Sequence, residues 1–164
     1  FALAAELGRL PSHLGESVWS ALWEAIHDPE QDLSVRRRAI ESLAYFDRPE
    51  VRAAIMRAYD DEDSTMRISA VFAMGRSTDE EWSTQILDEL ESESPEMRYE
   101  AARSCGELQL AGAVPRLSQM TADLDLEVKL AAVSSLGRIG GPEARRVLEI
   151  CVEMGDEALA EAAE

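Results

Sequence analysis

The chain has 164 residues, 46% hydrophobic and 30% charged, a composition typical of a folded domain with water-exposed helices. Its 33 acids against 16 bases give a net charge of −17, which opposes binding to nucleic acid and to anionic membranes. No window approaches the ~20 apolar residues that span a bilayer, and the N-terminus lacks the basic segment of a signal peptide.

The first 27 residues are predicted to be the end of a truncated leading repeat. Residues 7–10 match residues 136–139, a long turn is expected at residues 11–15, and a helix is expected at residues 16–27. The chain has no initiator Met and stops within a helix-like run of Ala and Glu. We therefore expect a piece of a longer protein, whose remaining repeats or domains are neighbours of this segment.

From residue 32 onward the sequence repeats every 31 residues. The pattern of residues 32–36 has Asp or Ser at the first position, an apolar residue at the fourth and a base at the fifth, and it returns in three further copies. The first residue of each copy can accept hydrogen bonds from backbone N–H groups that open a helix. The predicted caps are Asp32, Asp63, Ser94, Asp125 and Asp156.

Each predicted cap is followed by two apolar positions that recur in the repeat. We call the residues at one such recurring position a column. The first helix of each copy carries a small residue on its buried stripe, which lets neighbouring helices approach closely. These small residues are Ala39, Ala70, Ala101 and Ala132. The second helix opens near Pro or acidic residues, and its predicted core column is Ile55, Ile86, Leu117 and Leu148. No stretch alternates with period two, so no strand is expected.

These columns predict an all-α fold, a right-handed α-solenoid of stacked antiparallel helical hairpins with about 31 residues per repeat. One domain would cover residues 1–164. We predict a truncated leading repeat, four full repeats and the first helix of a further repeat, at residues 1–27, 28–60, 61–91, 92–122, 123–153 and 154–164.

The repeated pattern resembles a known family. Asp-x-x-Val-Arg, a following Ala, and Leu-Gly-x-Ile-Gly-x-Pro-Glu-Ala are similar to the HEAT repeat, specifically its short phycobilisome-lyase-type form. Residues 125–152 are the nearest copy, whereas the copies after residues 63 and 94 depart at their turns. The resemblance implies the solenoid, frequent Asp–Arg pairs between adjacent units, and a non-catalytic scaffold or adaptor that binds a protein partner through its concave face. The alternative is a subunit of a phycobilin lyase-type complex.

Nearly the whole net charge lies in the predicted turns between units, which hold 16 acids in 25 residues and no Lys or Arg. Stacking would align these turns on one edge, which we call the acidic ridge. Acids in these turns stabilise the helix N-termini and keep this edge soluble. Alternatively, they bind a Lys/Arg-rich segment or divalent cations. The ridge residues are Asp60, Asp61, Glu62, Asp63, Glu91, Glu93, Asp123 and Asp125.

Variable columns on the second helices are predicted to face solvent and to contact the partner. Trp19 and Trp23, one turn apart, are either an exposed binding anchor or packing against a preceding repeat or the core. The arginines either form a basic lining for an acidic peptide or are simply solvated. The candidate partner-binding residues are Trp19, Trp23, Arg52, Met56, Arg57, Leu87, Arg145 and Arg146.

Catalytic chemistry is sparse in the sequence. The two histidines, His13 and His27, form no His-x-x-x-His motif, and the His-Glu pairs of HEAT-like di-iron hydroxylases are absent. We therefore assign no catalytic residue, metal or cofactor. Cys105 and Cys151 lie in apolar helical stretches. They are predicted to be reduced, buried thiols of a cytoplasmic protein, the alternative being a disulfide or a reactive thiol.

Overall fold

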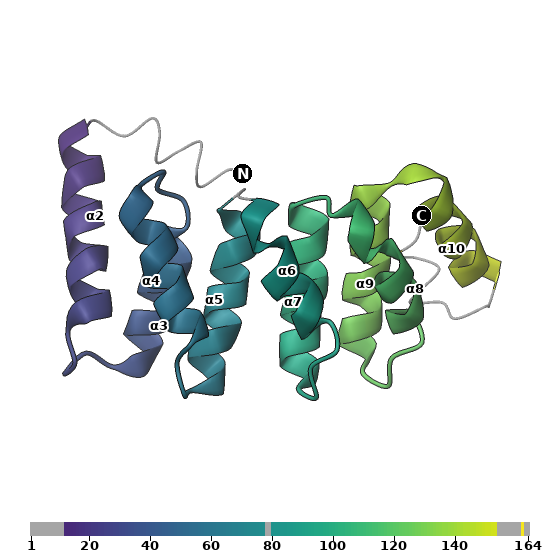
Figure 1. Cartoon of the computed structure of the whole chain (residues 1–164), viewed down its shortest axis with the longest axis horizontal. Helices are drawn as coiled ribbons and strands as arrows, with labels where there is room; N and C mark the ends of the chain where they lie inside the picture. The colour runs from purple at the N-terminus through teal and green to yellow at the C-terminus, as the bar shows by residue number, and fades with distance from the viewer. Residues whose placement is uncertain (1–11, 78–79, 154–161, 163–164) are drawn as a thin grey trace. The chain divides into compact units, whose positions relative to one another are not determined.

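The protein is described by a computed structural model, which covers residues 12–77, 80–153 and residue 162. All the regular elements in these ranges are helices, and no strand occurs among them. The fold is an α-solenoid of helical hairpins, as the 31-residue repeat predicts (Figure 1). The chain divides into two compact units, residues 1–77 and residues 78–164.

The first unit contains four helices. They are α2 (Ser12–His27), α3 (Leu33–Leu43), α4 (Pro49–Tyr59) and α5 (Ser64–Arg76). Helix α3 packs against both α2 and α5, and α4 packs against α5 (Figure 1). The turn expected at residues 11–15 is wrong from residue 12 onward, because α2 already begins at Ser12.

The second unit alternates long first helices with second helices that are mostly short. Its elements are η1 (Glu80–Trp82), α6 (Ser83–Glu89), α7 (Pro95–Glu107), η2 (Ala111–Ala113), α8 (Val114–Met120), α9 (Leu126–Ile139) and α10 (Gly141–Glu153). Helices α7 and α9 share the most extensive contact, and α10 packs against α8 and α9. A 3₁₀ turn precedes both α6 and α8, which leaves only seven residues for each α-helix.

The caps of the four described first helices are confirmed. Each capping oxygen accepts a hydrogen bond from a backbone N–H two or three residues later, which satisfies a donor without an intrahelical partner. The pairs are Asp32 with Ser34 at 2.8 Å, Asp63 with Thr65 at 2.8 Å, Ser94 with Met97 at 3.2 Å, and Asp125 with Val128 at 3.1 Å. Asp156 and most of the helix predicted at residues 154–164 lie outside the described residues.

The small-residue column is buried as predicted. Ala70, Ala101 and Ala132 have no exposed surface, and Ala39 is 2% exposed. Two apolar positions depart from their columns. Val35 is 43% exposed although its equivalents are buried, and Leu148 is only partly buried against Val133 and Cys151.

Ala101→Leu is expected to lower the free energy of unfolding by about 1–3 kcal/mol, because three added carbons have no free volume beside this fully buried helix position. Because Arg57 is exposed, Arg57→Ala should change the free energy of unfolding by less than about 0.5 kcal/mol. Urea unfolding followed by circular dichroism compares the two variants. Equal unfolding midpoints would contradict the register of the repeat.

Candidate functional site

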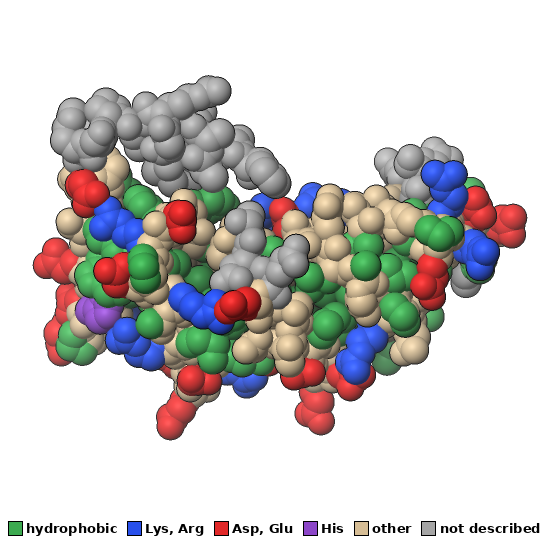
Figure 2. All heavy atoms as spheres, turned by 45° about the horizontal axis from the view of Figure 1, so that its top comes forward, with side chains coloured by type: hydrophobic (Ala, Val, Ile, Leu, Met, Phe, Trp, Pro, Cys, Tyr) green, Lys and Arg blue, Asp and Glu red, His purple; other side chains and the backbone are tan. Residues whose placement is uncertain are grey.

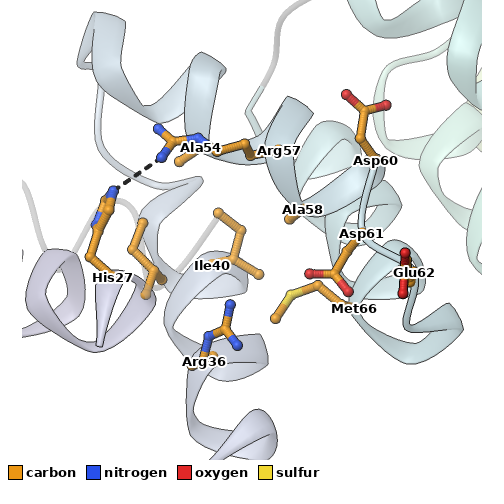
Figure 3. Close-up of a pocket in the computed structure, with 11 residues that line it drawn as sticks. His27, Arg36, Ile40, Ala54, Arg57, Ala58, Asp60, Asp61, Glu62 and Met66 are labelled. Atoms are coloured by element: carbon orange, nitrogen blue, oxygen red, sulfur yellow. Dashed lines mark hydrogen bonds between the residues drawn. The ribbon is translucent and has the colours of Figure 1, made fainter. Parts of the chain in front are cut away.

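An open groove of about 570 Å³ lies in the first unit, where α2 ends and α4 turns into α5. It draws residues from α2, α3, α4 and α5, so the packing of one hairpin on the next creates it. Figure 3 shows His27, Arg36 and Arg57 around Ile40, with the acids of the α4–α5 turn on the other side. The lining residues are Ile26, His27, Arg36, Ile40, Ala54, Arg57, Ala58, Asp60, Asp61, Glu62 and Met66.

Arg36 is the distinctive group of this groove. Its Nε atom is buried and has no hydrogen-bond partner among the described residues. A buried donor without an acceptor costs free energy, and such groups are rare in folded proteins. Arg36 therefore presents hydrogen-bonding capacity that the described part of the fold does not use.

The equivalent arginine of the second unit, Arg98, is fully engaged. Its Nε and Nη2 donate to the two carboxylate oxygens of Asp123, both at 2.9 Å, and its Nη1 donates to the carbonyls of Ser92 and Glu93 at 2.9 and 3.1 Å. This bidentate pair holds the pKa of the Asp123 carboxyl below its ordinary value. The pairing between adjacent units that the family resemblance implies is thus present at Arg98.

His27 and Arg57 form another part of the basic lining. His27 Nδ1 lies 2.8 Å from the carbonyl oxygen of Trp23. Because a carbonyl only accepts, Nδ1 carries the proton in this contact. The other ring nitrogen, Nε2, then faces Arg57 Nη1 at 3.5 Å, the outer limit for a hydrogen bond (Figure 3).

The acids of the ridge have mixed roles. In each unit the inter-repeat turns lie at one edge, from which acidic side chains project in Figure 2. Asp61 and Asp123 each accept the backbone N–H two residues later at 2.9 Å, and Glu91 pairs with Arg116. Among the residues described, no group of three His, Cys, Asp or Glu is placed to hold a metal ion.

Trp19 is buried, so its interpretation as an exposed anchor is wrong. It is 9% exposed, stacks on Trp23 with ring centroids 5.1 Å apart, and meets Phe46 edge-on at 5.5 Å. The Arg48 guanidinium lies 4.2 Å from its ring. The packing alternative therefore applies to Trp19, which contacts Trp23 on its own helix and Phe46 and Arg48 of the following segment. Trp23 is half-buried and adjoins His27.

The other candidate residues are spread over both units. Arg52 and Arg57 are exposed on α4, Arg145 and Arg146 are exposed on α10, and Met56 and Leu87 are half-buried. Their columns are not uniformly solvent-facing, because Val114, which shares the column of Arg52, is 5% exposed. The groove brings Arg57 together with Arg36 and His27, two residues that the sequence analysis did not assign to the binding face.

Both cysteines are free and buried, which confirms the predicted reduced, buried thiols. Burial raises the pKa of the Cys105 thiol to about 12. The thiol, rather than the nucleophilic thiolate, is therefore present near neutral pH. Cys105 serves to fill the core between helices.

Comparison with known proteins decides the family. The family model for HEAT repeats matches residues 19–90 and residues 83–164. This chain belongs to the HEAT repeat family. A HEAT repeat-containing taxis protein of Halobacterium salinarum is 30% identical to it over 152 residues, which cover 80% of this chain and 37% of that protein.

Two enzymes are also similar to this HEAT repeat chain. Deoxyhypusine hydroxylase of Arabidopsis thaliana is 33% identical over 121 residues, 72% of this chain and 38% of the enzyme. The chain thus spans about two fifths of the length of these curated relatives. In the solved complex of the phycocyanin lyase proteins CpcE and CpcF of Nostoc, the matched chain has a TM-score of 0.63 at 15% identity. The match covers 90% of this chain and 62% of that one, and it shows the fold alone.

The relatives include both a taxis protein and enzymes, so membership of the family does not decide between binding and catalysis. None of the helices in the described ranges is long and apolar enough to cross a membrane.

Proposed function

We propose that this HEAT repeat chain is a non-catalytic scaffold or adaptor segment of a cytoplasmic protein, which binds a protein partner through its second helices. The groove of the first unit supports this proposal most directly. It is built on α4, it is open, and it presents basic, apolar and acidic side chains within about 570 Å³. A surface of this mixed character suits a protein segment better than a nucleic acid or a lipid bilayer.

The exposed charges of the second helices support the same conclusion. Arg57 on α4 and Arg145 on α10 are exposed, while Ile55 on α4 and Ala144 on α10 are buried. Arginine is enriched where proteins bind each other, because its planar guanidinium makes several directed hydrogen bonds.

Affinity capture with the parent protein tests the proposal. We expect Arg57→Glu together with Arg145→Glu to abolish capture of a specific partner, because both changes reverse charge on the second helices. Arg38→Glu is the matched control, since Arg38 has an 80% exposed side chain on the first helix α3. Equal loss of the partner in the control and the double variant would contradict the proposed face.

The acidic ridge predicts a second property of partner binding. If a Lys/Arg-rich segment binds the ridge, the dissociation constant should rise steeply between low and physiological ionic strength, because salt screens exposed charges. Isothermal titration of the captured partner at several salt concentrations measures this dependence. An affinity that does not change with salt would exclude the ridge as the binding surface.

The second candidate function is a subunit of a phycobilin lyase-type complex. Its support is the fold similarity to the phycocyanin lyase proteins. Titration of the chain with a free bilin distinguishes the candidates, because a chromophore-handling subunit would change the absorption spectrum of the bilin.

A further inference from the structure

We propose that the groove of the first unit is a receptor for an acidic side chain of the protein partner, with the carboxylate bound by Arg36 and Arg57. This inference rests on the proposed scaffold function and specifies the chemistry of one of its contacts. The carboxylate would come from a segment that also carries an apolar residue and a basic residue.

Arg36 and Arg98, which occupy equivalent positions of the repeat, differ in their hydrogen bonds. Arg98 satisfies its guanidinium with a carboxylate and two backbone carbonyls of its own chain. Arg36, 62 residues earlier in the same column, has a buried Nε without an acceptor in the described ranges of the chain. An external carboxylate would pair with the guanidinium of Arg36 from the groove, through its terminal Nη groups rather than its buried Nε.

The position of Asp61 explains why Arg36 is not already paired. Asp61 matches Asp123 in the repeat, and each accepts a hydrogen bond from the backbone two residues on. In Figure 3 the Asp61 carboxylate lies beyond Met66 from Arg36, on the acidic side of the groove. The internal acceptor is therefore present in the sequence but displaced from the donor.

Arg57 supplies the second cationic group. Its side chain is exposed on α4, and its Nη1 contact with His27 Nε2 is long, at 3.5 Å. A carboxylate is a stronger acceptor for a guanidinium than an imidazole at that distance. Arg57 can consequently turn to a ligand at little cost, while the buried Ile40, which lies between the two arginines in Figure 3, is part of the groove wall.

The remaining lining selects the kind of ligand. Ala54, Ala58 and Met66 extend the apolar surface, and Asp60, Asp61 and Glu62 form the acidic side. These acids would repel a polyphosphate or nucleic acid but attract a Lys or Arg beside the bound carboxylate. A peptide with the order acidic–apolar–basic, or the reverse, matches the arginines, the apolar surface and the acidic side of the groove.

The test uses two blocked tripeptides as probes, acetyl-Glu-Leu-Lys amide and acetyl-Lys-Leu-Glu amide. Each is titrated into the ¹⁵N-labelled full chain, and amide shifts are followed by NMR. We expect saturable shifts around Ile40 and Ala58 with one or both probes. Arg36→Gln, Arg57→Gln, or Gln in place of the probe's Glu should each weaken binding about tenfold, the effect of losing a charge-assisted hydrogen bond.

Arg145→Gln is the control variant, because Arg145 is exposed on α10 and does not line the groove. Its affinity for the probe should equal that of the wild type. Equal binding of the Glu and Gln probes, no binding of either Glu probe, or undiminished binding by Arg36→Gln would overturn the proposal. A stability cycle adds another decisive outcome. Strong non-additivity between Arg36→Gln and Asp61→Asn, measured by unfolding, would show that the two residues pair internally, and would equally overturn it.

The outcomes also separate this inference from the scaffold function. If the probe binds but the parent chain captures no protein, the carboxylate site is supported and the scaffold function is contradicted. If a partner is captured and Arg36→Gln does not affect its capture, the scaffold function is supported and the carboxylate site is contradicted.

Discussion

Arg98→Gln is expected to lower the free energy of unfolding by about 2–4 kcal/mol, whereas Arg36→Gln should change it by less than about 0.5 kcal/mol. Arg98 makes four hydrogen bonds. Its side chain is only 19% exposed, and that of Asp123 is only 11% exposed. Its loss leaves the Asp123 carboxylate poorly solvated and without its cation. Arg36 occupies the same column but has no partner at Nε in the part of the chain that the structure describes, so little is lost with its charge.

Urea unfolding of both variants and the wild type, under identical salt conditions, measures the difference. Because the two arginines share a position in the repeat, helix propensity and cap distance are nearly matched between them. A large destabilisation by Arg36→Gln would show that Arg36 is paired within the chain. A small effect of Arg98→Gln would show that the Asp123 pair does not stabilise the fold.

The pH dependence of the same pair has a defined sign. The pKa of Asp123 is lowered in the folded protein from an ordinary 3.8, chiefly by its hydrogen bonds with Arg98. Its stabilising contribution is therefore full above about pH 4 and is lost as pH falls through the folded pKa. We expect the destabilisation by Asp123→Asn to be constant near neutral pH and to shrink below about pH 4.

The fold was predictable because each unit buries the same positions against similar neighbours. Ala101 and Ala132 are fully buried, and Asp63 and Asp125 cap their helices, as the 31-residue columns indicate. The residues of one column lie on the same face of equivalent helices. In every unit with a neighbour on both sides, this face packs against the adjacent helices. The fold class therefore follows from periodicity alone.

The departures occur where a unit differs from its neighbours. Trp19 shares the position of the exposed Arg52 in the repeat, yet it is buried and contacts Phe46. Gln109 takes a left-handed conformation, with φ of 52°, at the turn position where the last repeat has Gly140. Column comparison carries no information on such turns, because turn geometry depends on residues that the repeat does not hold constant.

The candidate site was only half predictable for a related reason. Arg57 stood out as a variable, charged position on a second helix. Arg36 did not, because the repeat gives it the same sequence context as Arg98. Whether each arginine pairs with its internal carboxylate depends on the conformation of the α4–α5 and α8–α9 turns. Residue identity alone does not encode such conformations.

Gly106→Ala is expected to lower the free energy of unfolding by about 1–3 kcal/mol, although alanine favours helix formation over glycine by about 1 kcal/mol. A Cβ at this position would lie 2.6 Å from Ser135 Oγ and 2.9 Å from Ser135 Cα. The side chain cannot simply rotate away, because Ser135 Oγ donates a buried hydrogen bond to the Ala102 carbonyl at 2.7 Å. Helices α7 and α9 would have to separate.

Gly137→Ala is the matched control, since Gly137 occupies the same column one repeat later and a Cβ there meets nothing within 4 Å. It should stabilise the protein by about 0.5 kcal/mol through helix propensity alone. Thermal and urea unfolding of the two variants compare one substitution in two packing environments. The α7–α9 contact is the most extensive between the helices that the structure describes. Equal effects of both substitutions would therefore mean that α7 and α9 do not approach as closely as the Ser135–Ala102 hydrogen bond requires.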